Sequence, residues 1–285
     1  MTMHIDAHQH FWAPARGDYG WMDPDDPVLA RNYRLADLEP HLDRHGISAT
    51  VLVQAAPSVG ETEYMLGIAD STHRVAGVVG WIDFEKPDHI RHLERFSGHD
   101  KFRGVRPMIQ DIADDDWMLR PDLDWAFRAL IDHDIAFDAL GFPRHLERFL
   151  KLFNRYPDMR VIVDHCMKPQ IADGAFDVWA SNIARLAEET GAWCKLSGLV
   201  TEASEKWTVD ELRPYADHVL DRFGPERIVW GSDWPVCTLH AEYDQWVEAT
   251  HQLLAGLSDE QRTAVLGGNA VRFYRLEAVS GKEAA

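Results

Sequence analysis

Short apolar runs recur along the whole chain, separated by stretches in which apolar residues lie three or four positions apart. The first pattern is typical of buried strands and the second of helices that cover them. Eight runs are predicted as strands, at residues 3–8, 49–54, 76–82, 102–106, 136–140, 160–164, 193–196 and 228–231. Because strands that alternate with helices form parallel sheets, the pattern predicts an α/β protein.

Helical stretches occupy the intervals between these strands. They are predicted at residues 35–44, 62–72, 88–96, 123–133, 144–155, 176–189 and 209–222, with two more at 244–255 and 259–274 after the last strand. The Gly-Gly-Asn sequence at 267–269 is interpreted as a helix break. Eight strand–helix repeats without interruption favour a closed (β/α)8 TIM barrel over an open sheet. We therefore expect a single domain over residues 1–276 and a C-terminal tail over residues 277–285.

The predicted connections differ in length at the two ends of the barrel. Connections from a helix to the next strand are short, as at residues 45–47 and 223–225, whereas connections from a strand to the next helix are long, as at 11–34 and 108–122. In such barrels the loops after the strands carry the active site. Functional residues are therefore expected at the carboxyl ends of the strands.

The charge and the cysteine content limit which partners the protein can have and in which cellular compartment it works. The chain of 285 residues has 47 acidic and 29 basic side chains, a formal net charge of −18. It has no cluster of Lys and Arg, so we expect neither nucleic acid nor a membrane surface as a partner. The three cysteines do not form a disulfide framework, and the N-terminus lacks a secretory pattern, which together predict a cytoplasmic protein. The oligomeric state stays open.

His8 and His10 lie two positions apart at the end of the first predicted strand. Side chains two apart on a strand project to the same face, so both imidazoles can reach one ion inside a barrel. Zinc, which binds His and carboxylate ligands, is the leading choice. In a chain with 15 histidines such a pair also arises by chance, and its position at a strand end is what favours function.

Three more polar residues end apolar runs. Asp233 follows residues 228–232, and a carboxylate at this position must be paired, hydrogen-bonded or bound to a metal. Its structural alternative is a helix cap or an ion pair. His165 is interpreted as a metal ligand, a donor to a substrate carbonyl or a core histidine. Arg106 can orient carboxylate or hydroxyl groups through two hydrogen bonds, or form a salt bridge.

Further side chains at the same predicted face are candidates for substrate contact. They are Trp12, Trp21, Gln54, Trp81, Arg106, Lys168 and Trp234. Aromatic rings suit the C–H faces of a sugar, although ordinary packing explains any single tryptophan equally well. The chain has no G-x-S-x-G motif and no phosphate-binding loop, so a covalent serine mechanism has no support.

Four motifs together resemble the amidohydrolase superfamily, most closely its branch of sugar-acid and dicarboxylate lactonases. The motifs are Asp6-Ala7-His8-Gln9-His10-Phe11-Trp12, Gly104-Val105-Arg106, Val163-Asp164-His165 with Lys168-Pro169, and Trp230-Gly231-Ser232-Asp233-Trp234-Pro235. The resemblance covers nearly the whole chain and implies a (β/α)8 barrel. It implies that His8 and His10 are the metal ligands of the first strand, and that Asp233 is the base.

The resemblance also limits the metal content. Binuclear relatives bridge two metals with a Lys or Glu after the fourth strand and have a His after the fifth, where this chain has Arg106 and Asp138. One divalent metal is therefore expected, with zinc as the leading choice, and catalysis without metal is the alternative. The expected ligands are His8, His10, His165 and Asp233.

The implied activity is hydrolysis of an aldonolactone, with L-fuconolactone or a close relative as the leading substrate. Asp233 would take a proton from water and return it to the leaving ring oxygen, while a metal, or His165 and Arg106, would polarise the carbonyl. The alternatives are a metal-dependent decarboxylase on the same barrel, a hydrolase of dicarboxylate lactones, and a catalytically silent sugar-binding protein.

Overall fold

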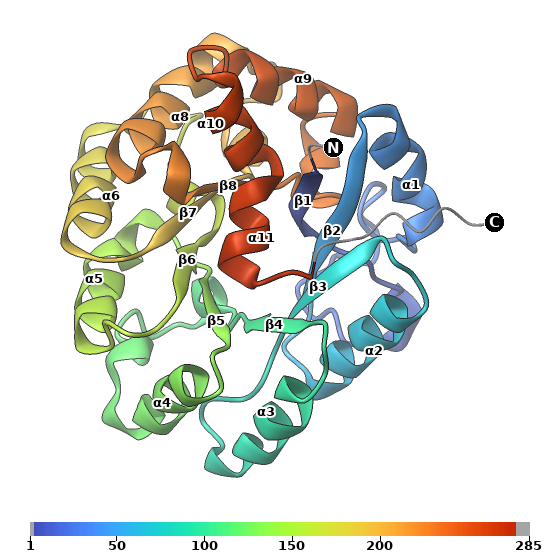
Figure 1. The fold of residues 1–285 in the computed structure, drawn as a ribbon, viewed down its shortest axis with the longest axis vertical. Coiled ribbons are helices and arrows are strands. Elements are labelled where there is room, and N and C mark those ends of the chain that lie inside the picture. Colours follow the sequence, from blue (N-terminus) through green and yellow to red (C-terminus); the bar gives the residue numbers. More distant parts are fainter. Residues whose placement is uncertain (1–2, 278–285) are drawn as a thin grey trace.

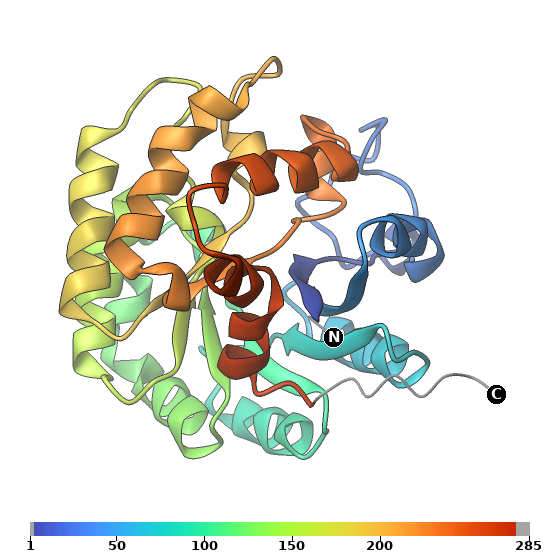
Figure 2. The ribbon, with the colours of Figure 1, turned by 45° about the horizontal axis from the view of Figure 1, so that its top comes forward.

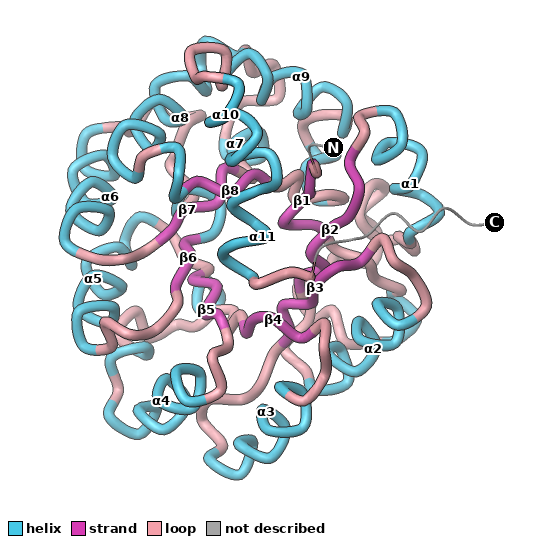
Figure 3. Tube along the Cα trace, viewed as in Figure 1, coloured by secondary structure: helices cyan, strands magenta, loops and turns pink. Residues whose placement is uncertain are grey.

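In the computed structural model, which describes residues 3–277, eight parallel strands form a ring surrounded by helices (Figures 1 and 3). The strands are His4–Gln9 (β1), Ile47–Val53 (β2), Val75–Gly80 (β3), Phe102–Val105 (β4), Ala136–Ala139 (β5), Val161–Val163 (β6), Trp193–Leu196 (β7) and Ile228–Trp230 (β8). Each strand pairs with its neighbours in sequence order. The segment after β8 pairs with β1, since the amide of Asp233 donates to the carbonyl of His8 over 2.7 Å. The predicted TIM barrel is confirmed.

Most α-helices of the described residues lie around the ring of strands as an outer layer (Figure 1). The helices are Leu35–Arg44 (α1), Val59–Asp70 (α2), Ile90–Ser97 (α3), Asp124–Asp132 (α4), Leu146–Arg155 (α5), Asp177–Glu189 (α6), Leu199–Glu202 (α7), Val209–Phe223 (α8), Tyr243–Leu253 (α9), Asp259–Thr263 (α10) and Asn269–Tyr274 (α11). None of the helices within residues 3–277 has the length and apolarity needed to cross a membrane.

Most predicted elements exist, with ends that differ by a few residues. The long connection between the strand predicted at 193–196 and the helix predicted at 209–222 contains a short helix, α7, which the sequence did not predict. The helix predicted over 259–274 is interrupted by a π-helical turn, Ala264–Gly268. A side chain on Gly267 would overlap the carbonyl of Met3, so this glycine lets the break approach the start of β1.

Two apolar layers hold the barrel together. The larger one lies between the strands and the surrounding helices. The smaller one fills the amino end of the barrel, where Ile5, Ala7 and Val229 pack against Phe273 and Tyr274. These two aromatic residues belong to α11, which lies across the ring (Figures 1 and 2). The amino end is therefore closed by the chain itself, and the carboxyl end is left for polar groups.

A register shift in β1 marks the change from apolar to polar interior. Ile5 and Ala7 face the inner apolar layer, so strict alternation would turn His8 outward. Asp6 pairs with Thr50 and Gln9 with Leu52, which is three steps along β1 against two along β2. Such a bulge places one extra residue and re-aims the side chains that follow it. It brings His8 into the barrel interior, where Lys195 Nζ lies 3.0 Å from its Nδ1.

Candidate active site

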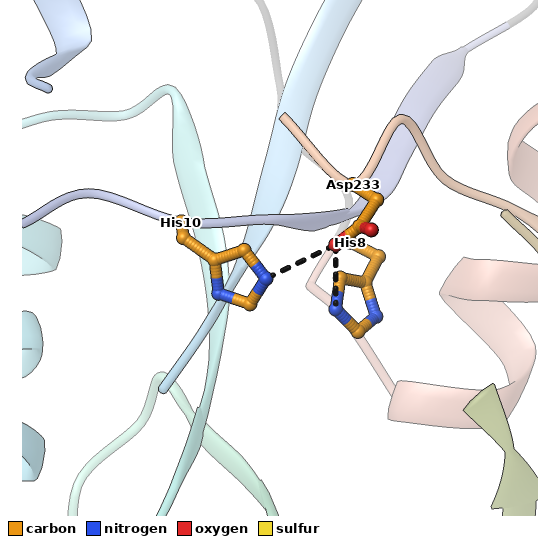
Figure 4. A group of neighbouring side chains, drawn as sticks. All are labelled: His8, His10 and Asp233. Atoms are coloured by element: carbon orange, nitrogen blue, oxygen red, sulfur yellow. Dashed lines mark hydrogen bonds and ion pairs between the residues drawn. The ribbon is translucent and has the colours of Figure 1, made fainter. Parts of the chain in front are cut away.

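Three imidazoles and one carboxylate meet at the carboxyl end of the barrel. Asp233 Oδ1 lies 3.3 Å from His10 Nε2, 3.7 Å from His8 Nε2 and 3.9 Å from His165 Nε2. Figure 4 shows the His8 and His10 rings presenting a nitrogen to the same carboxylate. All four side chains are buried. The residues predicted to form a metal site are thus brought together, from β1, the end of β6 and the end of β8.

The side chains of Asp233 and His165 are directed into the site by unusual backbone conformations. Asp233 has φ of 59°, and the four residues from His165 to Lys168 all have φ between 49° and 59°. Non-glycine residues rarely adopt this left-handed region, which costs about 1–2 kcal/mol per residue. Strain of this kind persists only where the surrounding structure enforces it, and it concentrates at functional sites.

The turn that carries His165 is enforced by its neighbours. Its Nδ1 lies 2.9 Å from Ser197 Oγ, and the carbonyl of Cys166 accepts a hydrogen bond from the indole of Trp179 over 2.8 Å. Gly198 has φ of 67°, and a Cβ there would lie 2.7 Å from His165 Nδ1. Glycine at this position therefore leaves the room that the imidazole occupies.

The hydrogen bonds of His10 bear on metal binding. Its Nδ1 lies 2.7 Å from the carbonyl oxygen of Val53, which can only accept, so Nδ1 carries the proton. The other nitrogen, Nε2, then presents a lone pair to Asp233 Oδ1 at 3.3 Å. Two acceptors this close need a cation or a proton between them. Since the ligand atoms of His8, His10 and Asp233 lie within 4.8 Å of one another, the residues fit a divalent ion.

Burial and neighbouring charges set the protonation states. Burial lowers the pKa of His165 to about 4, although Asp233 and Asp164 oppose this shift. Burial also lowers the pKa of His10, and it lowers that of His8 well below the ordinary range, with Lys195 as the next cause. Burial alone would raise the pKa of Asp233, but His165 and His10 outweigh it and hold it at about 2. Near pH 7 the site therefore has three neutral imidazoles and one carboxylate.

A second set of buried charges lies directly beneath this site, and sequence reasoning missed its central residue. Lys195, on β7, forms ion pairs with Asp138 and Asp164, and its Nζ lies 3.0 Å from His8 Nδ1. The available signal was a charged residue in the middle of the short strand Trp193-Cys194-Lys195-Leu196. A buried lysine is rare unless it is paired, so a charge at that position indicates an interior ion pair.

Above the site is a cavity of about 170 Å³. Drug-sized ligands occupy about 300–1,000 Å³, so this space suits a single small ring. It is lined by His10, Trp12, Trp21, Ala55, Arg106, Met108, Gln110, Asp111, Leu140, His165, Lys168, Asp233 and Val236. Of the residues predicted to contact substrate, four line this cavity: Trp12, Trp21, Arg106 and Lys168.

The other three lie elsewhere. Gln54 is fully buried behind the cavity and donates to the carbonyl of Arg106 over 2.6 Å. Trp234 is buried edge-on against Tyr33. Trp81 lines a larger neighbouring cavity of about 800 Å³, which shares the wall residues Trp21, Met108 and Asp111 with the smaller one.

The barrel and its site define the class of protein. Residues 5–276 match the Amidohydrolase family, and the chain belongs to this family. It is 43% identical to L-fucono-1,5-lactonase from Burkholderia ambifaria, over 99% of each chain. It is 36% identical to L-fucono-1,5-lactonase from Burkholderia multivorans, over 96% of this chain and 97% of the relative. A solved amidohydrolase from Burkholderia multivorans with bound Zn superposes with a TM-score of 0.91 at 36% identity, covering 96% of this chain and all of that one.

Proposed function

We propose that this protein is a lactonase that hydrolyses a sugar lactone, with L-fucono-1,5-lactone as the leading substrate. The observation that carries the proposal is a single ionised carboxylate, Asp233, held among three imidazoles at the base of a cavity for one small ring. The similarity to two L-fucono-1,5-lactonases over nearly the full chain supports the choice of substrate.

Catalysis begins with attack of water on the ring carbonyl carbon. Asp233 accepts a proton from the attacking water, and the negative charge that develops on the carbonyl oxygen is stabilised by His165 and Arg106. If Ser197 donates to His165 Nδ1, the Nε2 proton of that imidazole points into the cavity. The bond from the carbonyl carbon to the ring oxygen then breaks, and Asp233 returns its proton to the leaving oxygen. The product acid ionises and releases one proton to solvent.

A divalent ion, with zinc as the first candidate, would be held by His8, His10 and Asp233, with His165 in reach. When bound, it would polarise the carbonyl and favour ionisation of water. The solved relative with bound Zn supports this assignment.

The cavity lining favours a neutral, hydroxyl-rich ring over a dicarboxylate. Arg106 and Lys168 are its only fixed cations among the described residues, and Asp111 and Asp233 are acidic. Each carboxylate of a dicarboxylate lactone would need its own buried partner. Trp12 and Trp21 offer aromatic faces for the C–H groups of a sugar. A decarboxylase or a silent binding protein is less favoured, since a base beside three imidazoles serves hydrolysis directly.

We also propose that the protein works in the cytoplasm. Its cysteines, Cys166, Cys194 and Cys237, are all free and buried. Free thiols persist in a reducing compartment.

Proton release in a pH-stat tests the proposed activity. The purified protein should hydrolyse L-fucono-1,5-lactone with a higher kcat/KM than 2-pyrone-4,6-dicarboxylate or a muconolactone. A preference for the dicarboxylate would recast Arg106 and Lys168 as specificity residues and overturn the proposal. Release of carbon dioxide from a carboxylated phenol, without lactone hydrolysis, would indicate the decarboxylase alternative.

A further inference from the structure

The proposed mechanism makes no use of the cavity of about 800 Å³ that Trp81 lines. This volume falls within the range of about 300–1,000 Å³ that small-molecule sites occupy, whereas the catalytic cavity of about 170 Å³ suits a single small ring. The two cavities share the wall residues Trp21, Met108 and Asp111. A group attached to a ring in the catalytic cavity therefore has the larger cavity directly beyond these three residues.

The tryptophan in this shared wall is held in place by the protein. The indole of Trp21 donates a hydrogen bond of 2.6 Å to the carbonyl of Ala55, which lines the catalytic cavity. Its ring packs edge-on against Trp12, with 5.5 Å between the ring centroids. Trp21 is nevertheless 40% exposed. It can therefore contact one ring inside the catalytic cavity and a second ring outside it.

Two further tryptophans in the wall of the larger cavity have a free donor. Nearby, the indoles of Trp12, Trp21 and Trp125 each donate to a backbone carbonyl. The indoles of Trp81 and Trp117 have no such partner within residues 3–277, although Trp117 is only 5% exposed. Buried donors are almost always satisfied, so the acceptors for these two N–H groups must come from whatever fills the cavity.

These two aromatic walls are fixed by their surroundings. The N–H of Trp81 donates to Thr62 Oγ1 over 2.8 Å, and that hydroxyl donates to the carbonyl of Trp81 over 3.1 Å. Gly80 leaves room for this contact, since a Cβ there would lie 2.6 Å from Thr62 Cγ2. Trp117 packs on Phe84, with 6.0 Å between the ring centroids. A wall that is already ordered lowers the entropic cost of binding a ligand.

The charges of the larger cavity favour a neutral ligand. One basic side chain, Lys86, and four acidic ones line it, namely Asp18, Asp83, Glu85 and Asp111. The first three acids already pair with a basic side chain over 2.5–2.9 Å, so they do not require a cationic ligand. Their remaining lone pairs can accept hydrogen bonds from hydroxyl groups, and the aromatic faces suit the C–H groups of a sugar. A neutral sugar ring therefore fits this cavity, whereas a carboxylated ring would be repelled.

We propose that the larger cavity is a subsite for a second sugar ring, and that the protein hydrolyses aldonolactones which carry a neutral glycosyl group. The lactone ring lies in the catalytic cavity beside Asp233, and the glycosyl ring lies beyond Trp21, against Trp81 and Trp117. Water adds across the bond from the carbonyl carbon to the ring oxygen, the glycosidic bond stays intact, and the product is a glycosylated aldonic acid. The choice of substrate rests on the proposed function, whereas binding of the sugar ring does not.

A binding experiment tests the subsite without any turnover. The indole ¹H–¹⁵N signals of Trp81 and Trp117, assigned by their loss in Trp81→Phe and Trp117→Phe, are followed while methyl β-D-glucopyranoside is added. We expect these signals to shift and to saturate, because the sugar supplies the missing acceptors. Methyl β-D-glucuronide, which has a carboxylate in place of the hydroxymethyl group, should bind about tenfold more weakly. Signals that do not move, an equal response to the glucuronide, or a stronger response to tetramethylammonium would overturn the proposal.

Turnover tests the connection between the two cavities. In the pH-stat assay, L-fucono-1,5-lactone is compared with its 2-O-, 3-O- and 4-O-β-D-glucopyranosyl derivatives. We expect one derivative to exceed the parent lactone about tenfold in kcat/KM, mainly through a lower KM. If none of the three exceeds the parent, the proposal is wrong. If no lactone is hydrolysed, the proposed function fails and the binding titration alone decides the subsite.

Trp81→Ala and a matched control separate stacking from a general loss of structure. Trp81→Ala should lower the ratio of kcat/KM between the best derivative and the parent lactone by about tenfold. Trp207 is also half-buried but lines neither cavity, and its indole donates to the carbonyl of His240 over 2.9 Å. Trp207→Ala should therefore keep the wild-type ratio. An equal ratio in the two variants would contradict the proposal.

Discussion

The two ends of the barrel interior are built from the same eight strands and have opposite chemistry. At the amino end, Ile5, Ala7 and Val229 pack against Phe273 without a charged group among them. At the carboxyl end, the interior is lined by imidazoles and by Asp233, and the backbone there is strained. Stability and chemistry are therefore separated along the barrel axis, at the register shift after Ala7.

Lys195 and its two carboxylates lie at the boundary between these ends. They are fully buried, like the apolar floor, but they contact His8, which belongs to the site above. Breaking a buried ion pair by removing one partner is strongly destabilising, by about 3–5 kcal/mol. The boundary is therefore the one place where stability and chemistry should depend on the same residues.

The largest effect is expected from Asp233→Asn. The amide has nearly the same shape but cannot accept the water proton, so kcat should fall by about 10²–10⁴-fold. The Tm should stay close to that of the wild type, because the apolar floor is untouched. The pH-stat assay and a thermal melt check the two halves of this expectation. A well-folded variant that keeps most of its turnover would show that another group is the base.

Phe273→Ala should have the opposite profile. Removing a buried aromatic ring from the floor costs about 3–5 kcal/mol through lost burial and the cavity left behind. Turnover per folded molecule should change little, because the ring lies at the end of the barrel away from Asp233. Urea unfolding gives the free energy, and kcat is measured well below the unfolding transition. A loss of kcat as large as that of Asp233→Asn would show that the two ends are not separable.

Gly198→Ala isolates the positioning of His165. Both Gly198 and Gly174 have left-handed backbones, with φ of 67° and 62°, so alanine at either should cost about 1–2 kcal/mol. Only at Gly198 would the new Cβ meet the His165 ring, since no atom lies within 4 Å at Gly174. Gly198→Ala should lose about 10–100-fold in kcat, and Gly174→Ala should keep its turnover. Equal turnover in the two variants would remove His165 from the mechanism.

Lowering the pH should reduce the free energy of unfolding, because acid protonates His165 at the carboxyl end of the barrel. The pKa of His165 is about 4 in the folded protein against 6.5 in the unfolded chain, so the unfolded chain binds more protons between these values. This contribution is fully present above pH 6.5 and is lost as the pH falls toward 4, at up to ~3 kcal/mol. Urea midpoints at pH 7, 5.5 and 4.5 should fall in that order, and less steeply in His165→Gln. A midpoint that does not move between pH 7 and 4.5 would contradict this assignment.

The fold and the convergence of the site were accessible from the sequence for physical reasons. Buried parallel strands read as apolar runs, and a polar residue that ends such a run must lie where the strands end, as Asp233 and His165 do. The backbone geometry that directs these side chains into the site could not be predicted from the sequence. Nothing in the residues 165–168 signals a left-handed turn, since none of them is glycine or asparagine.

The inward orientation of Lys195 is a second feature that could not be predicted from the sequence. In a four-residue strand, alternation is too short to reveal which side chains face inward, so the interior position of Lys195 was not recognised. Its partners come from β5 and the end of β6, and such pairing depends on which strands become neighbours. Gln54 and Trp234 lie near predicted strand ends as well, but their side chains turn into the protein and not toward the cavity.

The most direct test of the separation between the two ends is to measure Asp233→Asn and Phe273→Ala side by side. For each variant, kcat on L-fucono-1,5-lactone is expressed per folded molecule and compared with the free energy of unfolding under the same conditions. The account predicts a crossed result, in which Asp233→Asn loses turnover and keeps stability, while Phe273→Ala loses stability and keeps turnover. Parallel losses of both quantities in both variants would contradict it.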